Sequence, residues 1–321
     1  MTSIALVFPR SIRHFIESMP APIYNRIEEV RIRQDRPLEV ITSKESGFVH
    51  RTTKRLTQNQ EEAYCPTKLD CEKMINLISR HSLYTMEEEL RRGYITITGG
   101  HRVGIAGRVV VENGKVKLIR DITGFNVRFA RAILDVGRSL IPYVIHDQQV
   151  ENLLIVSPPQ CGKTTLIRDL ARLASTGTDQ TPAYKVGIID ERSEIAGCLH
   201  GVPQHDVGPR TDVLDACPKA EGMMMMIRSM SPEILVVDEI GHKEDSRAVF
   251  EAIFAGVRLF TTAHAYSLAD LCRRPTMSEL VKKRVFTRIV VLSRRRGPGT
   301  VEAIYDQSLK QIDEQVVNRK C

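Results

Sequence analysis

Residues 153–166, LLIVSPPQCGKTTL, constrain the fold of this chain more than any other stretch. Four apolar residues suit a buried strand, a proline-rich turn follows, and the residues after Gly162 repeat apolar side chains at helical spacing. A strand, a loop ending in Gly-Lys-Thr and a helix are the context of a phosphate-binding P-loop. In such a loop a lysine contacts the β- and γ-phosphate oxygens and a hydroxyl coordinates Mg²⁺. We assign these two roles to Lys163 and Thr164.

The loop departs from the pattern G-x-x-x-x-G-K-[ST] at two positions that often carry glycine, now Ser157 and Gln160. Glycine is common there because the backbone adopts conformations that a Cβ atom disfavours, or approaches the phosphate closely. We expect nucleotide binding to survive both changes, because Gly162, Lys163 and Thr164 are intact. The residues predicted to surround the nucleotide are Ser157, Pro158, Pro159, Gln160, Cys161, Gly162, Lys163, Thr164 and Thr165.

Polar side chains lie at or just beyond the ends of three of the predicted strands. They are Asp190 and Glu191, Asp238 and Glu239, and Thr262 and His264. The carboxyl ends of parallel strands line the ligand crevice of a sheet, so we expect these groups to meet at the phosphate loop. The run ILVVDE is a Walker B pattern, in which Asp238 holds Mg²⁺ and Glu239 polarises the attacking water. Taken singly, an acid after an apolar run also fits a helix N-cap or a turn.

Glu239 also bears on the type of reaction. A glutamate directly after the Walker B aspartate is typical of P-loop ATPases that activate water with an acid, whereas P-loop kinases and GTPases generally lack it. The sequence therefore favours ATP hydrolysis over phosphoryl transfer to a second substrate, with ATP and Mg²⁺ as the bound cofactors.

From residue 152 onward, short apolar runs alternate with helical patterns, which indicates a parallel sheet with crossover helices. The predicted strands are 153–156, 185–189, 234–237, 259–262 and 288–292. They predict an α/β fold with a RecA-like P-loop NTPase core in residues 138–321, preceded by a smaller α+β domain in residues 1–137. The predicted elements of that domain are a short helix near the N-terminus, strands within 28–41 and at 94–98, 102–111 and 115–119, and helices at 71–81 and 83–92.

Three smaller features have simple structural interpretations. Arg31, Arg33 and Arg36 are expected near one exposed edge of paired strands, as a solvated face. Methionines 223–226 are expected to pack from a helix against the sheet as adaptable core residues. The seven cysteines include no C-x-x-C pair, which argues against a zinc site and favours free thiols.

Charge and composition narrow the possible partners. The net charge of +7 leaves room for nucleic acid, acidic lipid or an acidic protein without choosing among them. Because there is no tryptophan and only 5% of residues are aromatic, platforms for base stacking are scarce and nucleic acid is not expected as a partner. There is no apolar run long enough to span a membrane and no basic leader before an apolar segment, so we expect a cytoplasmic protein.

Several runs resemble one known family. They are KAEGMMMMIRSMSPEILVVDEIG (219–241), DERSEIA (190–196), DVGPRTDVL (206–214) and TAHA (262–265), with VRIRQDRPLEV (30–40) and GGHRVG (99–104) in the first domain. Together they resemble the stage III sporulation AA proteins, which are ATPases similar to those of type II and type IV secretion. The resemblance covers nearly the whole chain and fails at positions 157 and 160, where the family loop reads glycine.

The resemblance implies roles for further residues. Asp190 and Glu191 resemble the aspartate box of secretion ATPases, an acidic pair near the γ-phosphate, and His264 resembles the His-box residue that senses nucleotide state. Arg210 is a candidate for a cation that completes the site, from the same or a neighbouring subunit. Arginines of the first domain are equally candidates, and surface or structural roles are the alternative for all of them. These arginines are Arg102, Arg108 and Arg128.

The resemblance therefore predicts a hexameric ring ATPase that powers the assembly of, or transport through, a membrane channel during sporulation. Its expected partners are further copies of itself and membrane proteins of that channel, which would recruit it to the membrane. A RecA-like nucleic-acid motor of the helicase type is one alternative, built on the same core. A nucleotide-gated adaptor with little hydrolysis is another, because the phosphate loop is altered.

Overall fold

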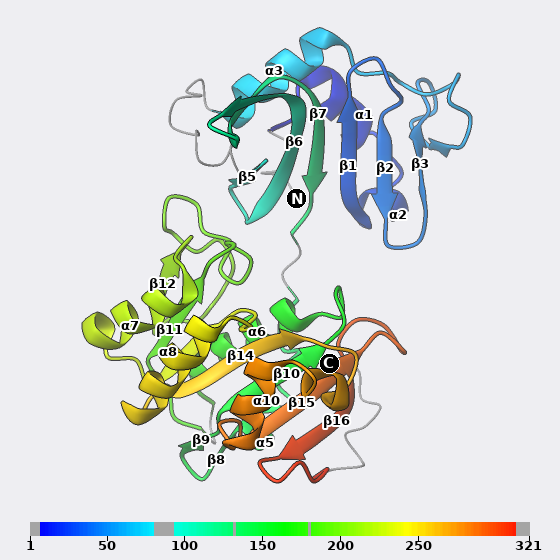
Figure 1. Cartoon of the computed structure of the whole chain (residues 1–321). Coiled ribbons are helices and arrows are strands. Elements are labelled where there is room, and N and C mark those ends of the chain that lie inside the picture. The colour runs from blue at the N-terminus through cyan, green and yellow to red at the C-terminus, as the bar shows by residue number, and fades with distance from the viewer. Residues whose placement is uncertain (1–6, 80–92, 131–132, 179–180, 313–321) are drawn as a thin grey trace. The chain divides into compact units, whose positions relative to one another are not determined.

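The computed structural model describes residues 7–79, 93–130, 133–178 and 181–312. Their contacts divide the chain into two compact units, residues 1–131 and 132–321 (Figure 1). This division lies closer to the N-terminus than the boundary predicted at residue 137. The reason is that the backbone N–H groups of Asp135 and Gly137 donate hydrogen bonds to the Asp169 carboxylate of the second unit, at 3.1 and 2.8 Å.

The second unit is built on a seven-stranded sheet in the order β12-β11-β13-β14-β10-β15-β16. Its strands are β10 (Leu153–Ser157), β11 (Val186–Asp190), β12 (Thr211–Asp215), β13 (Ile234–Val237), β14 (Arg258–His264), β15 (Arg288–Ser293) and β16 (Thr300–Asp306). All run parallel except β16, which pairs antiparallel with β15. The five predicted strands and the α/β fold are confirmed, and the edge strands β12 and β16 are additional.

Helices cover both faces of this sheet because side chains of successive strand residues point to opposite sides. Leu153 and Ile155 pack with α6, whereas Leu154 and Val156 belong to a second cluster formed with α7, α8 and α10. Burial on both faces explains why the strands read as continuous apolar runs. The helices are α5 (Ile141–Val144), α6 (Lys163–Thr176), α7 (Lys219–Met230), α8 (Lys243–Phe254), α9 (Leu268–Leu271) and α10 (Pro275–Lys282), and a separate pair of short strands is β8 (Ile145–His146) with β9 (Gln149–Val150).

The methionine run lies on α7, as predicted, but only part of it enters the core. Met223 and Met226 are buried, whereas 48% of Met225 is exposed. Met226 packs directly on Gly187 of β11, where an added Cβ atom would lie only 2.6 Å from the methionine Cγ. The helical period therefore turns two of these side chains to the sheet and leaves another in solvent.

The first unit is a seven-stranded antiparallel sheet in the order β4-β3-β2-β1-β7-β6-β5. Its strands are β1 (Ile27–Arg33), β2 (Glu39–Thr42), β3 (Ser46–Val49), β4 (Leu56–Thr57), β5 (Tyr94–Ile97), β6 (His101–Glu112) and β7 (Lys115–Arg128), and its helices are α1 (Arg10–Glu17), α2 (Ala21–Tyr24) and α3 (Lys68–Ile78). Residues of α1 and α3 pack on one face of the sheet in a single core. The predicted helix at 83–92 lies outside the described residues.

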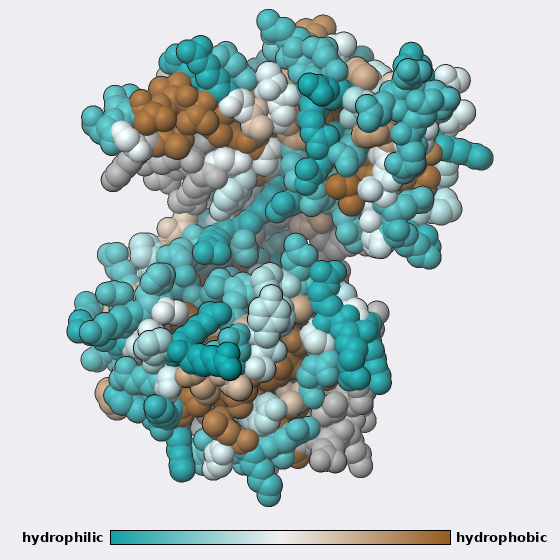
Figure 2. All heavy atoms as spheres, turned by 45° about the vertical axis from the view of Figure 1, so that its right-hand side comes forward, coloured by the Kyte–Doolittle hydropathy of each residue, from teal (hydrophilic) through white to brown (hydrophobic). Residues whose placement is uncertain are grey.

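The predicted strands of this unit are confirmed, with longer bounds for β6 and β7. The distal parts of these two strands extend beyond the neighbouring strands β5 and β1, since the pairing of β5 with β6 ends at Gly104 and that of β1 with β7 starts at Gly124. This extension exposes Val109, Val111 and Val116. The surface visible in Figure 2 is mostly hydrophilic, with hydrophobic residues gathered in separate patches.

Candidate functional site

The phosphate loop connects the end of β10 to the start of α6, as expected. Gly162 caps the helix with a φ of +88°, in the left-handed region that a Cβ atom disfavours. Gln160 lies in the same region, with a φ of +59°. The usual glycine at position 160 is therefore explained by backbone conformation, and glutamine there is strained.

Ser157, the other position that often carries glycine, is in a different environment. It is the last residue of β10 and is fully buried. Its hydroxyl donates a hydrogen bond to the Pro158 carbonyl (2.8 Å) and accepts one from the Lys163 ammonium (3.2 Å). The serine thus adds to the loop an acceptor that glycine lacks.

The Lys163 ammonium is buried and fully engaged with acceptors of its own chain. It donates to the carbonyls of Ser157 and Pro158, both at 3.2 Å, and to Nδ1 of His264 at 2.9 Å. Burial lowers the pKa of Lys163, and the negative charges of Asp238 and Glu239 oppose this shift. The carboxylates of the two Walker B acids therefore lie close enough to the Lys163 ammonium to interact with its positive charge.

A threonine of β14 holds the two Walker B acids in place. The Thr262 hydroxyl donates to Oδ1 of Asp238 at 2.8 Å and accepts the backbone N–H of Glu239 at 3.0 Å. The Glu239 backbone has a φ of +30°, so its side chain is aimed by an uncommon conformation. The sequence predicted that Thr262 lies at this edge, and the structure shows that it links β13 to β14.

His264 lies between Lys163 and the second Walker B acid, Glu239. It is the register partner of Ser157 on the neighbouring parallel strand. Because an ammonium only donates hydrogen bonds, Nδ1 of His264 accepts from Lys163 and the ring proton lies on Nε2. That Nε2 is 3.6 Å from a Glu239 carboxylate oxygen. The structure therefore brings Lys163, His264, Asp238 and Glu239 together.

Asp190 and Glu191, at the end of β11, are engaged with their own surroundings. The Asp190 carboxylate is fully buried and accepts the backbone N–H groups of Glu194 (2.7 Å) and Ala196 (2.8 Å). Burial raises the pKa of Asp190, and these backbone hydrogen bonds oppose the shift. Glu191 forms an ion pair with Lys219 of α7. Asp190 thus shapes the loop that follows β11 through these backbone hydrogen bonds.

Arg210 is the predicted site residue that the structure does not bring to the phosphate loop of its own chain. It directly precedes β12, and its carbonyl accepts the N–H of Val186 at the start of β11 (2.9 Å). Its own N–H donates to Ser175 near the end of α6 (2.7 Å). Since β11 and β12 run parallel, Arg210 lies at the edge of the sheet opposite Lys163. The strand order therefore separates Arg210 from the phosphate loop of its own chain, and its role in completing a site stays a prediction.

The arginine candidates of the first unit lie on its long central strands. Arg102 of β6 lies over the ring of Tyr94, 4.6 Å from the ring centroid. Arg128 of β7 is 3.4 Å from Glu29, and Arg108 is exposed on the extended part of β6. Each therefore occupies the surface of the first unit, where its predicted role stays a prediction.

Two cations near the site were not predicted from the sequence. Nη1 of Arg192 is 3.8 Å from the Glu239 carboxylate, and Nη1 of Arg294 donates to the side chain of Gln160 at 3.2 Å. Arg294 begins the turn between β15 and β16, whose Gly299 N–H donates to the Cys161 carbonyl at 2.9 Å. The sequence signals were an arginine directly after Asp190-Glu191 and an arginine run before a Gly-Pro-Gly turn. Neither sequence pattern shows which residues of the site the arginine side chain contacts.

The loop, the acids and the strand order define the class of this protein as a P-loop α/β fold. The solved structure of the Legionella pneumophila ATPase DotB matches with a TM-score of 0.57 at 15% identity, over 96% of this chain and 81% of that one. The pilus retraction motor PilT with bound ADP matches with a TM-score of 0.54 at 13% identity, over 83% of this chain and 74% of that one. At these identities the likeness shows the fold alone.

The chain belongs to the family described as sporulation stage III, protein AA, whose sequence model matches residues 2–312. Stage III sporulation protein AA of Bacillus subtilis (strain 168) is 50% identical over 307 residues, which are 96% of this chain and 95% of that protein. The uncharacterized protein ycf45 of Porphyra purpurea is 28% identical over 238 residues, 68% of this chain and 40% of that protein. The family resemblance of the sequence runs is confirmed. Within the described ranges, no helix is long and apolar enough to cross a membrane.

Proposed function

We propose that this protein is an ATP-hydrolysing motor of the secretion-ATPase type, which powers the assembly of, or transport through, a membrane channel during sporulation. The observation that carries the proposal is the chain of contacts from the loop lysine to the Walker B glutamate. Lys163 Nζ is 2.9 Å from His264 Nδ1, and His264 Nε2 is 3.6 Å from Glu239. The fold and the family are consistent with this proposal.

In this proposal Lys163 binds the β- and γ-phosphates. Its ammonium is held by neutral acceptors, the carbonyls of Ser157 and Pro158 and the ring of His264. Phosphate oxygens carry charge, and charge-assisted hydrogen bonds are roughly twice as strong as neutral ones. Nucleotide entry would therefore draw Lys163 from these acceptors, and the Nδ1 atom of His264 would lose its donor. That loss would report the nucleotide to Glu239.

Thr164 and Asp238 are the residues that would hold Mg²⁺. Both offer oxygen atoms, which this cation prefers, and the Thr164 hydroxyl has no hydrogen-bond partner among the described residues. Across the described part of the chain, no three His, Cys, Asp or Glu side chains are grouped as metal ligands. This fits a cation whose other ligands are phosphate and water. When bound, it would neutralise charge on the phosphates.

Glu239 would act as the general base that accepts a proton from the attacking water. Its backbone N–H is fixed by Thr262, and its carboxylate faces His264 and Arg192. Replacing Glu239 by glutamine removes the base and keeps the shape. We expect ATP turnover to fall at least about a hundredfold, because general bases contribute roughly 10²- to 10⁴-fold. ATP binding should be retained.

The test is steady-state ATP turnover together with equilibrium ATP binding for Glu239→Gln and Lys163→Ala. Lys163→Ala should lose binding at the loop as well as turnover. Glu244→Gln makes the same chemical change at an exposed position of α8 and should leave both quantities unchanged. Unchanged turnover in Glu239→Gln would contradict the proposal.

A nucleotide-gated adaptor with little hydrolysis is the second candidate. The observation that favours it is the loop itself, where Gln160 is strained and Lys163 is occupied by protein acceptors. In that case the wild-type protein binds ATP with negligible turnover, and Glu239→Gln changes neither. The measurements above separate the two candidates.

A further inference from the structure

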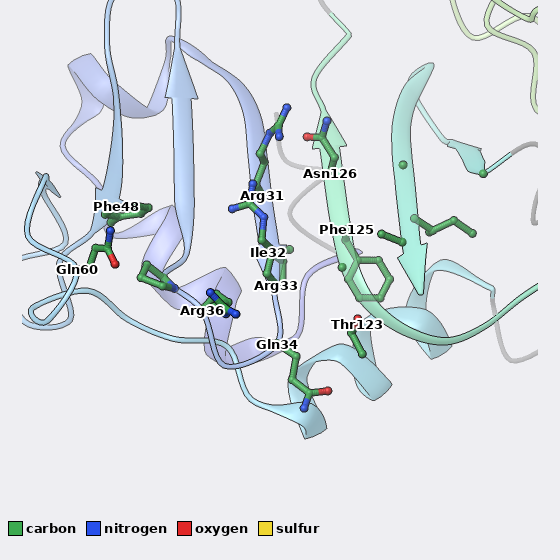
Figure 3. A pocket seen from close by; sticks show the side chains of 16 residues that line it. Arg31, Ile32, Arg33, Gln34, Arg36, Phe48, Gln60, Thr123, Phe125 and Asn126 are labelled. Atoms are coloured by element: carbon green, nitrogen blue, oxygen red, sulfur yellow. The ribbon is translucent and has the colours of Figure 1, made fainter. Parts of the chain in front are cut away.

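A pocket of about 860 Å³ opens on the first unit, on the face of its sheet opposite α1 and α3 (Figure 3). Arg31, Arg33 and Arg36 line its middle in this view, with Phe48 on one side and Asn126 on the other. The solvated face predicted for these arginines is therefore hollow. None of these residues has a part in the proposed ATP site.

The hollow follows from the strand register. Arg31 and Arg33 of β1 lie opposite Asn126 and Gly124 of β7, and the next strand places Gly104 and Ala106 opposite these two. Residues directly opposite each other in an antiparallel pair point to the same face. Two glycines and an alanine therefore form a floor almost without side chains, beside a wall of arginines.

The wall carries excess positive charge. Arg33 pairs with Glu39 at 2.9 Å, and Arg31 pairs at 3.3 Å with Glu29, which also pairs with Arg128. The side chain of Arg36 is exposed and forms no ion pair with any residue that the structure describes. Two carboxylates thus face a larger number of guanidinium groups, and one of these groups is available to a ligand.

We propose that this pocket is a second nucleotide site, separate from the phosphate loop. Arg36, supported by Arg31 and Arg33, would bind phosphate through the planar guanidinium fork that matches phosphate geometry. Phe48 offers an aromatic face to a base, and the Asn126 amide offers both a donor and an acceptor to its edge. The volume is within the range of small-molecule pockets.

The test measures how many ATP molecules bind per chain, by equilibrium dialysis of the full-length protein. Wild type should bind two, and Lys163→Ala should bind one, at the pocket. In the Lys163→Ala background, Arg36→Ala should weaken the remaining site about tenfold or more, the usual value of a hydrogen bond to a charged group. Arg10→Ala removes the same charge from the exposed start of α1, on the opposite face, and should leave binding unchanged.

Two further variants separate a shaped site from general attraction of anions. Gly104→Val keeps every charge but fills the floor, where an added Cβ would lie 3.6 Å from Asn126 Cβ in ordinary contact. It should weaken the pocket site at least about tenfold, because its methyl groups occupy the space of the ligand. Phe48→Leu should weaken the binding of ATP and leave the binding of pyrophosphate unchanged, since only ATP has a base.

The outcomes distinguish this proposal from the proposed function. If Lys163→Ala binds neither ATP nor pyrophosphate, the pocket is no nucleotide site, while the phosphate loop stands. The pocket proposal is equally overturned if the remaining binding responds to neither Arg36→Ala nor Gly104→Val. If Lys163→Ala changes nothing and Arg36→Ala removes all binding, the pocket stands and the loop assignment fails.

Discussion

At the scale of single residues, the two departures of the phosphate loop have different physical meanings. Gln160 occupies a left-handed conformation that costs about 1–2 kcal/mol for a residue with a Cβ atom. Ser157 is an ordinary strand residue whose hydroxyl shares the Lys163 ammonium with the neighbouring carbonyls. Only the second departure competes directly with a phosphate for the lysine.

We therefore predict that Ser157→Ala tightens ATP binding about three- to tenfold, because a hydrogen bond of roughly 0.5–1.5 kcal/mol no longer holds Lys163 in the loop. Equilibrium binding of ATP to the full chain measures this. Ser229→Ala is the matched control, since it removes the same hydroxyl from an exposed position of α7, where that hydroxyl donates to the Met225 carbonyl. Weaker binding by Ser157→Ala would show that the hydroxyl supports the binding conformation of the loop.

At the scale of elements, the Thr262 hydroxyl of β14 holds the Walker B acids that follow β13. The neighbouring Thr261 provides a matched control for removing that hydroxyl. The buried Thr262 hydroxyl bonds both Walker B acids, whereas the equally buried Thr261 hydroxyl has no hydrogen-bond partner among the described residues. Thr262→Val should cost about 1–3 kcal/mol of unfolding free energy by leaving the Glu239 N–H unsatisfied. Thr261→Val should be neutral or stabilising. Urea unfolding and ATP turnover check both, and equal effects would contradict the link.

In the sheet of the second unit, the strands buried on both faces could be predicted from the sequence, and the edge strands β12 and β16 could not. Strands β10, β11, β13, β14 and β15 read as apolar runs because helices cover both of their faces. The edge strand β12, Thr211–Asp215, has a half-exposed pattern that resembles a loop. The strands β3 and β4 of the first unit are short and lie in a polar stretch, so no periodicity reveals them.

The candidate site could be predicted to the same extent, for a related reason. The sequence shows that Lys163, Asp238 and His264 lie at or just beyond the carboxyl ends of strands, because apolar runs mark the strand ends. Which groups touch depends on strand order, which the sequence does not contain. Asp190 looks equivalent to Asp238 in the sequence, yet backbone N–H groups of its own loop bind its carboxylate. Strand order also places Arg210 beside β12, at the edge of the sheet away from the phosphate loop.

At the scale of the whole molecule, the site of one chain is incomplete if hydrolysis needs an arginine supplied by a neighbour. Arg210 is suited to this role because its side chain is exposed and has no partner among the described residues, at the edge opposite its own loop. Removing an exposed side chain without partners changes stability by less than about 0.5 kcal/mol. A loss of turnover in Arg210→Ala with unchanged thermal unfolding would therefore report a role outside its own chain.

We predict that turnover per chain rises with protein concentration, and that Arg210→Ala lowers turnover of the assembled protein about 10³-fold or more, as for arginines supplied in trans. Mixing Arg210→Ala with Glu239→Gln provides the decisive measurement. Each variant alone is inactive, but in a mixed assembly the intact Glu239 of one chain meets the intact Arg210 of the next. Turnover of the mixture should then exceed that of either variant. If mixing restores nothing, while mixing with Arg102→Ala or Arg128→Ala does, the arginine comes from the first unit instead.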